Sequence, residues 1–591
     1  MMFNKKFKFL SLALLLMFSL LVLTACGDDD TDAPATDIGI DVSTDDNTDD
    51  ITVDGTVDLG AGWRGAMPNF DVGVSFHATE PIDVTMLFRE MAENPFNENW
   101  EMFQRLQEMT NVTIDVESVM HDDFADRRSL LLATGQAPEL MPFIWAGHEV
   151  PFIAGGQLLP IGRYFDYMPH FTNLVTEWDM WPVIENLRRA DGEIYILPGL
   201  FQDPRVRFTV ALRQDILEQL DIYSELEHGH PDSWEEIRLV LEEVAERKEE
   251  FGLDYVYFDR WTLDSTLNIA ASTWGVGAGW GLGSTMHFNH DTGEFEQFAQ
   301  MDEARDFVGY WAGLVADGLL HPESLTAGCE APWEAFVNGR SFMIGSYGTV
   351  IPYEQDRDNL IAEGLTHLEG LEFRALPIPQ GPLGVTGEQV IDNGIVLNNS
   401  LRQRDDFFAI LQFVDWIWFS QEGREFAIWG VEGTHFEWVD GYRQLMPGYF
   451  DTRYSLNLER QNEAGAQDMR IDLGFGENVW VLAAGSSRDL MTSRMDVATR
   501  ALHELNAQTR LRNRLNPSVP WAALGAQRQE MYAMWQTSIV DHTRSNIAAF
   551  IAGHRGMDNW DAFLGELEAM NLDAWVAAGN EAHQLGPIIP D

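Results

Sequence analysis

Strands and helices alternate between residues 82 and 145, and this order constrains the fold more than any other feature of the chain. Ile82–Phe88 has the apolar run of a buried strand, and residues 111–116 form a second strand rich in β-branched residues. Residues 99–109 and 124–133 have the apolar spacing of helices, and Leu140–Trp145 follows as a third strand. The order strand–helix–strand–helix–strand predicts a parallel sheet with right-handed crossovers.

The same kind of pattern resumes after Arg213. A long helix is expected from residue 232, with Asp232 or Ser233 as its N-cap. Residues 341–344 and 395–397 are short buried strands, and the chain after residue 405 is mostly helical in pattern. About 530 residues follow the acidic segment at the N-terminus. A segment of this length is too long for one small hydrophobic core, so we expect an α/β body made of two lobes.

The N-terminus has the layout of a secretory signal. Three lysines precede the uncharged apolar run Phe9–Leu23, and small residues follow it. The tetrapeptide from Leu23 to Cys26 resembles the lipobox of bacterial lipoproteins, which implies cleavage before Cys26 and lipidation of that cysteine. An uncleaved anchor with an incidental cysteine is the alternative, although the run is shorter than the roughly 20 residues of a spanning helix.

An acidic segment follows Cys26 and extends to about Gly60. Between Asp28 and Asp58 it contains twelve aspartates and no basic residue. Such a composition cannot bury enough apolar surface to offset the entropy of ordering, and its charges repel one another. We expect a disordered tether that holds a folded body away from a membrane surface.

Charge and cysteine content exclude several classes of function. The formal net charge of −56 argues against nucleic-acid binding through phosphates and against direct binding to anionic lipid. The two cysteines, Cys26 and Cys329, leave no intramolecular disulfide if Cys26 is lipidated. Zincin, serine-hydrolase and zinc-cysteine motifs are absent from the sequence, and the 15 histidines lack metal-ligand spacing. We therefore predict no catalytic residues, metal or cofactor.

Nine short segments, taken in order, resemble one family. They are similar to the extracellular solute-binding lipoproteins of family 1, the large lipoproteins that serve ABC importers in Gram-positive bacteria. Examples are the segment Leu131–Glu139, the segment Asp191–Pro198 and the segment Trp429–Phe436, in which Trp429 replaces the usual tyrosine. The other segments are 155–161, 212–217, 231–236, 314–323, 336–343 and 550–563.

The resemblance implies a type II periplasmic-binding-protein fold, in which two α/β lobes are joined by a hinge. We expect a signal peptide at 1–25, a lipidated tether at 26–60 and a two-lobed body at 61–591. The first lobe is expected at about 80–205 and 397–430. The second is expected at about 212–390 and 440–591.

The resemblance also implies a function. The chain is expected to be a monomer at the cell membrane, lipid-anchored and facing outward. It would capture a small molecule, expected to be an oligosaccharide, by lobe closure and deliver it to ABC transporter permease subunits. The alternatives are a surface glycoside-processing enzyme, a binder of peptides or another small solute, and a sensor or adhesin subunit.

Sugars are recognised by aromatic faces together with planar polar groups, and this chain has 20 tryptophans. Trp145 follows the third predicted strand, where open α/β sheets place ligands. Most tryptophans are nonetheless expected to be buried in the core. Arg207 and Asp203 are candidates to face the ligand, but an exposed ion pair between them explains the two residues equally well. The candidate ligand-binding residues are Trp145, Arg207, Trp274, Trp280, Tyr347 and Glu432.

Overall fold

A computed structural model describes residues 62–586, with gaps at 92–93, 190, 204–207, 278–281, 283–284, 290, 348–350, 385–389, 453–455, 477–486, 496–498, 502, 505–523 and 525. The predicted signal, Cys26 and the acidic tether lie outside the described residues. Within the described part, no helix has both the length and the apolar character needed to cross a membrane.

The first sheet has five strands in the order β2-β1-β3-β11-β4. Strands β1 (Ile82–Glu90), β2 (Val112–Met120) and β3 (Leu140–Ile144) are parallel, and β11 (Ile391–Leu397) is antiparallel to both β3 and β4 (Ile196–Leu200). Helices α1 (Glu101–Thr110) and α2 (His121–Thr134) connect the parallel strands. The predicted strand–helix alternation is therefore confirmed.

The second sheet has four strands in the order β10-β5-β9-β6. Strand β5 (Phe208–Arg213) lies antiparallel between β10 (Phe373–Ala375) and β9 (Ser341–Tyr347), and β6 (Tyr255–Tyr257) is parallel to β9. Val210 and Leu212 enter a large core, whereas Ala211 enters a smaller one. This alternation places a hydrophobic core on each face of the sheet.

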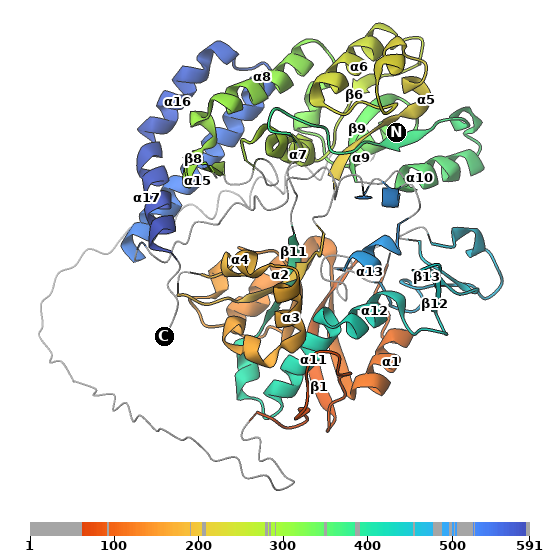
Figure 1. The fold of residues 1–591 in the computed structure, drawn as a ribbon, viewed down its shortest axis with the longest axis vertical. Helices are drawn as coiled ribbons and strands as arrows, with labels where there is room; N and C mark the ends of the chain where they lie inside the picture. Colours follow the sequence, from red (N-terminus) through yellow and green to blue (C-terminus); the bar gives the residue numbers. More distant parts are fainter. Residues whose placement is uncertain are drawn as a thin grey trace, which may run out of the picture. The chain divides into compact units, whose positions relative to one another are not determined.

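Each sheet has its own set of helices and its own core, so the fold has two lobes. The colours of Figure 1 show that each lobe is formed by segments that are separate in the sequence. The chain passes to the second lobe after β4, returns before β11, and passes again between α13 and α15. The first lobe contains α3 (Pro169–Glu177), α4 (Trp181–Glu185), α11 (Phe407–Phe419), α12 (Gln421–Trp429) and α13 (Arg488–Thr492). The second contains α5 (Gln214–Leu217), α6 (Trp234–Glu246), α7 (Asp264–Trp274), α8 (Asp302–Ala316), α9 (Glu330–Val337), α10 (Ile351–Ala362), α15 (Ala526–Ile551), α16 (Trp560–Ala569) and α17 (Leu572–Leu585).

The segment after α12 joins the first core. Its short strands are β12 (Phe436–Val439), β13 (Tyr442–Leu445), β14 (Tyr449–Phe450) and β15 (Gln467–Asp468). Phe436, Leu445, Met469 and Phe475 are buried in the same cluster as β1 and β11. The expected boundary assigned residues from 440 onward to the second lobe, whereas these apolar side chains are buried against the first. The hairpin of β7 (Met286–Asn289) and β8 (Glu294–Gln297) lies in the second lobe.

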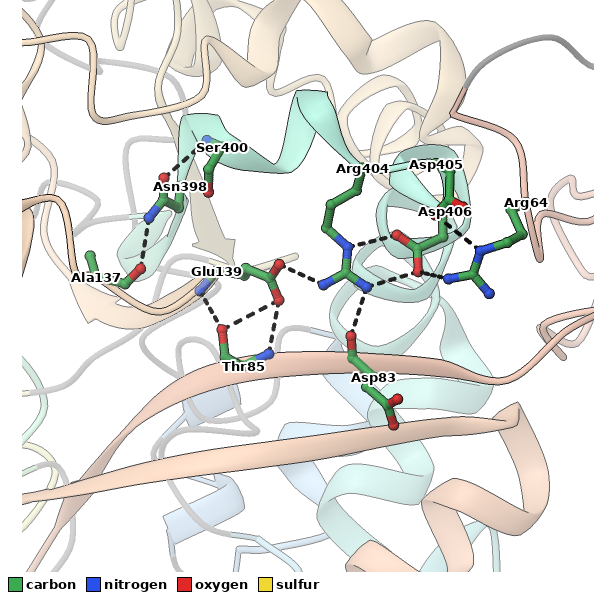
Figure 2. A network of polar contacts seen from close by, with 10 residues as sticks. All are labelled: Arg64, Asp83, Thr85, Ala137, Glu139, Asn398, Ser400, Arg404, Asp405 and Asp406. Carbon is green, nitrogen blue, oxygen red and sulfur yellow. Dashed lines mark hydrogen bonds and ion pairs between the residues drawn. The ribbon is translucent and has the colours of Figure 1, made fainter.

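A polar network fixes one edge of the first sheet (Figure 2). Asp406, which is fully buried, accepts hydrogen bonds from Arg404 at 2.7 and 2.8 Å and from Arg64 at 2.6 Å. Arg404 also donates to Glu139 at 2.6 Å, and Glu139 accepts from the backbone nitrogen of Thr85 at 3.0 Å. The network joins the start of β1, the start of β3 and the N-terminus of α11, at the edge opposite the carboxyl ends of the parallel strands.

Candidate ligand-binding site

The carboxyl end of β3 meets the start of β11 and the end of β4 at one edge of the first sheet. Ile144 is paired with Gly394, and Leu200 is paired with Ile391. Open α/β sheets place ligands outside the carboxyl ends of their strands. Side chains that follow these strand ends are therefore the first candidates for ligand contact.

A β-bulge at the start of β11 sets the direction of two polar side chains. The register shifts between Asp392 and Gly394, so Asn393 is the extra residue. A Cβ at Gly394 would lie 2.1 Å from the Leu197 carbonyl oxygen, which explains the glycine. The bulge holds Asp392 and Asn393 at the edge, where each side chain is nine-tenths buried.

Trp145 is the aromatic residue at this edge. Its Nε1 donates a 3.0 Å hydrogen bond to Asp392 Oδ1, and the Phe143 ring meets its indole edge-on at 4.7 Å. The loop after Trp145 is held by the fully buried Glu149, which accepts from the Gly147 backbone nitrogen at 2.7 Å and from Arg189 Nε at 2.6 Å. Trp145 itself stays half-buried, so an immobilised indole is presented at the sheet edge.

Arg89, at the end of β1, supplies a positive charge beside Phe143, the ring that contacts Trp145. Its guanidinium lies 3.5 Å from the centroid of the Phe143 ring, and its NH1 donates to His121 Nδ1 at 3.2 Å. Because arginine can only donate, His121 Nδ1 must accept in this arrangement. Phe143 has a φ of 61°, which an aromatic residue rarely adopts and which marks strain next to a candidate site.

The second sheet has a similar arrangement after β6. Asp259 is fully buried and accepts hydrogen bonds from the backbone nitrogens of Arg260 and Gly345, both at 2.8 Å, and from the Tyr257 and Thr266 hydroxyls, both at 2.7 Å. Burial raises the pKa of the Asp259 carboxyl above its ordinary value. This network fixes the segment that follows β6, and Arg260 and Trp261 come directly after Asp259 in that segment.

Trp261 begins an unusual left-handed turn. Trp261, Thr262 and Leu263 have φ values of 54°, 56° and 68°, and each such non-glycine residue costs about 1–2 kcal/mol. The turn is held by backbone bonds from Trp261 to Gly328 at 3.1 Å and from Thr262 to Ala327 at 2.9 Å. Strain of this kind persists only where the surroundings enforce it, and it is concentrated at functional sites.

The Trp261 indole is held by its neighbours. The Arg260 guanidinium lies 3.9 Å from the centroid of the indole, and the Phe208 ring meets it edge-on at 5.5 Å. Arg260 is 1% exposed and donates to the Gly345 carbonyl at 2.9 Å. Each lobe thus presents a half-buried tryptophan at or shortly after the end of a strand that is parallel to a neighbouring strand.

The predicted site residues have different outcomes. Trp145 lies at the strand edge as described above, whereas Trp274 ends α7 and is buried in the second core against Trp234 and Tyr310. Trp274 is therefore a core residue in this structure. Arg207 and Trp280 lie outside the described residues. Tyr347 ends β9, and the structure describes its backbone, which is paired with Phe208.

Glu432 lies on the surface, whereas Asp203 is buried in an ion pair. Glu432 is exposed in the turn after α12, and the nearby His435 contacts α1 through Glu101 at 3.7 Å. Asp203 is buried and accepts two hydrogen bonds from Arg488, at 2.5 and 2.7 Å. This ion pair joins the segment after β4 to α13. The predicted pairing of Asp203 with Arg207 lies outside the described residues.

Sequence reasoning missed Arg89, Asp392, Asn393, Arg260 and Trp261. The Asp392-Asn393-Gly394 run before a predicted strand is a turn-like signal that could have identified the bulge. The left-handed turn at Trp261 contains no glycine or asparagine, so its sequence carries no such signal. In the part of the chain that the structure describes, no group of histidine, cysteine, aspartate and glutamate could hold a metal ion.

No family model matches this chain, and no curated protein matches it either. Solved structures do match. An HMO-binding solute-binding protein associated with an ABC transporter of Bifidobacterium longum infantis has a TM-score of 0.59 and 13% identity, over 86% of this chain and all of that one. The ABC-transporter substrate-binding protein FusA of S. pneumoniae, in complex with kestose, has a TM-score of 0.56 and 17% identity, over 85% and 99% of the two chains. The alginate-binding protein AlgQ2 has a TM-score of 0.57 and 15% identity, over 86% and 99%. These likenesses show that the chain has the two-lobed fold of solute-binding proteins.

Proposed function

We propose that this chain is the substrate-binding component of an ABC importer and that it captures an oligosaccharide between its lobes. The observation that carries the proposal is the pair of half-buried tryptophans, with Trp145 directly after β3 of the first sheet and Trp261 four residues after β6 of the second. Sugar rings stack their C–H faces on indoles, and their hydroxyls need paired donors and acceptors. Asp392 bonds Trp145 and Asn393 follows it, and Arg89 lies over the neighbouring Phe143 ring, so such polar groups are present near the indole.

The structural neighbours support the same proposal. The proteins with this fold that are named above bind kestose, HMO or alginate, and two of them belong to ABC transporters. A ligand that contacts both lobes only in the closed form shifts the population toward that form. We therefore propose that the ligand spans Trp145 and Trp261 when the lobes are closed.

We also propose that the protein is exported and attached by a lipid at Cys26. The proposal rests on the apolar run Phe9–Leu23, on the small residues before Cys26 and on the acidic segment that follows. Metabolic labelling with a palmitate analogue tests it. Label should enter the wild-type protein and be absent from a Cys26→Ser variant, and equal labelling of both would contradict the anchor.

A thermal-shift screen tests the proposed ligand class. Residues 59–591, which form one compact unit, would be screened against oligosaccharides, with peptides as controls. Ligand that binds only the folded state raises the melting temperature with concentration. A shift with an oligosaccharide, together with full recovery of the intact sugar by chromatography, is expected. A shift with peptides only, or conversion of the sugar to products, would contradict the proposal.

A further inference from the structure

A buried arginine joins two tryptophans in the second lobe. The Arg260 guanidinium lies 3.9 Å from the centroid of the Trp261 indole and 4.8 Å from that of Trp333. Trp261 follows β6, whereas Trp333 lies in α9, so the arginine connects segments that are far apart in the chain. Arg260 is 1% exposed, and its Nε donates to the Gly345 carbonyl at 2.9 Å. The guanidinium therefore has a fixed position in contact with both indoles.

Trp333 is fixed by α10. Its Nε1 donates to Asp356 Oδ2 at 2.7 Å, and its ring stacks on Tyr353 with the centroids 4.3 Å apart and an angle of 29° between the planes. Tyr353 is fully buried in the smaller core of the second sheet. Tyr353, Trp333, Arg260 and Trp261 thus form a cation–π cluster that extends from this core to the candidate site.

The backbone supplies a second link between α9 and the Trp261 turn. The backbone nitrogens of Trp261 and Thr262 donate to the carbonyls of Gly328 and Ala327, which lie just before α9 begins at Glu330. α9 is therefore joined to the left-handed turn by main-chain bonds and by the cation–π cluster. A shift of α9 relative to β6 would move the Trp261 indole.

The buried charge of Arg260 makes the two indoles depend on each other. A guanidinium that leaves water loses solvation free energy, and aromatic faces return part of it. Trp261 and Trp333 share this role. Without Trp333, the guanidinium would gain by moving toward solvent, and the Trp261 indole would lose the group that packs against its ring.

We propose that Trp333 is a positioning residue for ligand binding, which acts through Arg260 on the Trp261 indole. Trp333 itself makes no contact with the ligand in this account. The smaller core then sets how well Trp261 is presented, so the affinity depends on a part of the lobe outside the site. The inference rests on the proposed function, because Trp261 must contact the oligosaccharide.

A double-mutant cycle tests this role. The oligosaccharide with the largest effect in the thermal-shift screen is titrated by calorimetry into residues 59–591 of wild type, W261A, W333L and W261A/W333L. W333L should weaken binding by about fivefold or more. It should have no further effect in the W261A background, because it acts through that indole. The milder D356A removes the hydrogen bond that fixes the Trp333 indole and should weaken binding in the same direction.

L368A is the matched control, since Leu368 is fully buried in the same core and is not a member of the cation–π cluster. It should lower the melting temperature, as W333L does, without changing the affinity. Weak binding by W261A with full affinity in W333L and D356A would overturn the positioning role. An equal loss in L368A, or a W333L effect that persists in the W261A background, would overturn it as well. Unchanged affinity in W261A would contradict the proposed function, and this inference with it.

Cys329 allows a measurement that needs no sugar. It is exposed, Arg260 NH1 donates to its Sγ at 3.8 Å, and it is the single cysteine of residues 59–591. The rate at which a thiol reacts depends on the charge beside the sulfur. Displacement of the guanidinium in W333L should change the rate constant for reaction with dithionitrobenzoate by about twofold or more, and L368A should leave it unchanged. Equal rates in W333L and wild type would show that Arg260 keeps its position without Trp333, which would overturn the proposal.

Discussion

Trp145 Nε1 donates a hydrogen bond of 3.0 Å to Asp392 Oδ1, and this bond joins two segments that are 247 residues apart. It connects the end of β3 to the bulge at the start of β11. The bond fixes the plane of the indole, while the bulge fixes the carboxylate. A rigid aromatic surface beside buried polar groups needs little ordering when a ligand binds, which favours affinity.

The first prediction concerns Trp145. W145A should weaken binding of the identified oligosaccharide by about tenfold or more, because loss of a buried aromatic contact costs about 1.5–3 kcal/mol. W145F keeps a ring but loses the bond to Asp392 and should have an intermediate effect. The affinities would be measured by calorimetric titration. W274F is the control, because Trp274 is a core residue, and it should lower the melting temperature without changing affinity.

The second prediction concerns the strained turn at Trp261. T262G places glycine where φ is 56°, so it should remove about 1 kcal/mol of strain and leave the protein as stable as the wild type or more so. The freed turn should orient Trp261 less well and lower affinity for the oligosaccharide. Chemical denaturation and calorimetric titration give the two quantities. A gain in affinity, or a large loss of stability, would contradict the role assigned to the strain.

The third prediction concerns Asp203. Its hydrogen bonds with Arg488 hold the pKa of this carboxyl well below its ordinary range. A depressed carboxyl pKa stabilises the fold above the unfolded value near 3.9, and this stabilisation is lost as pH falls toward the folded value. D203N should therefore reduce the free energy of unfolding by about 1–3 kcal/mol at pH 7. The difference from wild type should shrink below pH 4 in urea titrations, and a difference that grows there would count against the ion pair.

The fourth prediction concerns Asp415, which is buried in α11 and accepts from the backbone nitrogens of His170 and Phe171 at 2.9 and 2.8 Å. Burial raises the pKa of Asp415 to about 8. A raised carboxyl pKa stabilises the fold fully below the unfolded value near 3.9, and this contribution is lost as pH rises toward 8. The free energy of unfolding of wild type minus that of D415N should decrease between pH 4 and 8. An increase over that range would contradict the buried, neutral carboxyl.

The fifth prediction concerns the network in Figure 2. R404A leaves the buried Asp406 with one fewer cation and Glu139 without its arginine, so it should reduce the free energy of unfolding by about 3–5 kcal/mol. The exposed Arg402 is two residues away, and R402A is the matched control with an expected change near zero. Equal effects of the two substitutions in urea denaturation would show that the network contributes little.

The strands and helices between residues 82 and 144 were predictable because local periodicity decides them. Apolar runs marked β1 and β3, and Ser233 caps α6 by accepting from the Glu236 backbone nitrogen at 3.1 Å, as its sequence position allows. The boundary near residue 440 was not predictable in the same way. The sequence around Leu445 and Phe475 has no apolar periodicity that indicates which of the two cores buries these residues.

The site was only partly predictable for a physical reason. Trp145 follows a strand that its sequence reveals, so its place at the sheet edge could be expected. Asp392 reaches Trp145 only because β11 pairs with β3 from far along the chain, and Trp261 is presented by a left-handed turn that long-range backbone bonds enforce. Trp274 precedes a glycine-rich segment in the sequence, which suggests a loop. It is nevertheless the last residue of α7, and the packing of this helix buries it in the second core.

The most direct test of the central claim is a calorimetric titration of one oligosaccharide, identified by the thermal-shift screen, into wild type, W145A and W261A. If the ligand spans the two lobes, both single variants should lose about tenfold or more in affinity while remaining folded. Unchanged affinity in both variants would contradict the claim that these two tryptophans form the ligand-binding site.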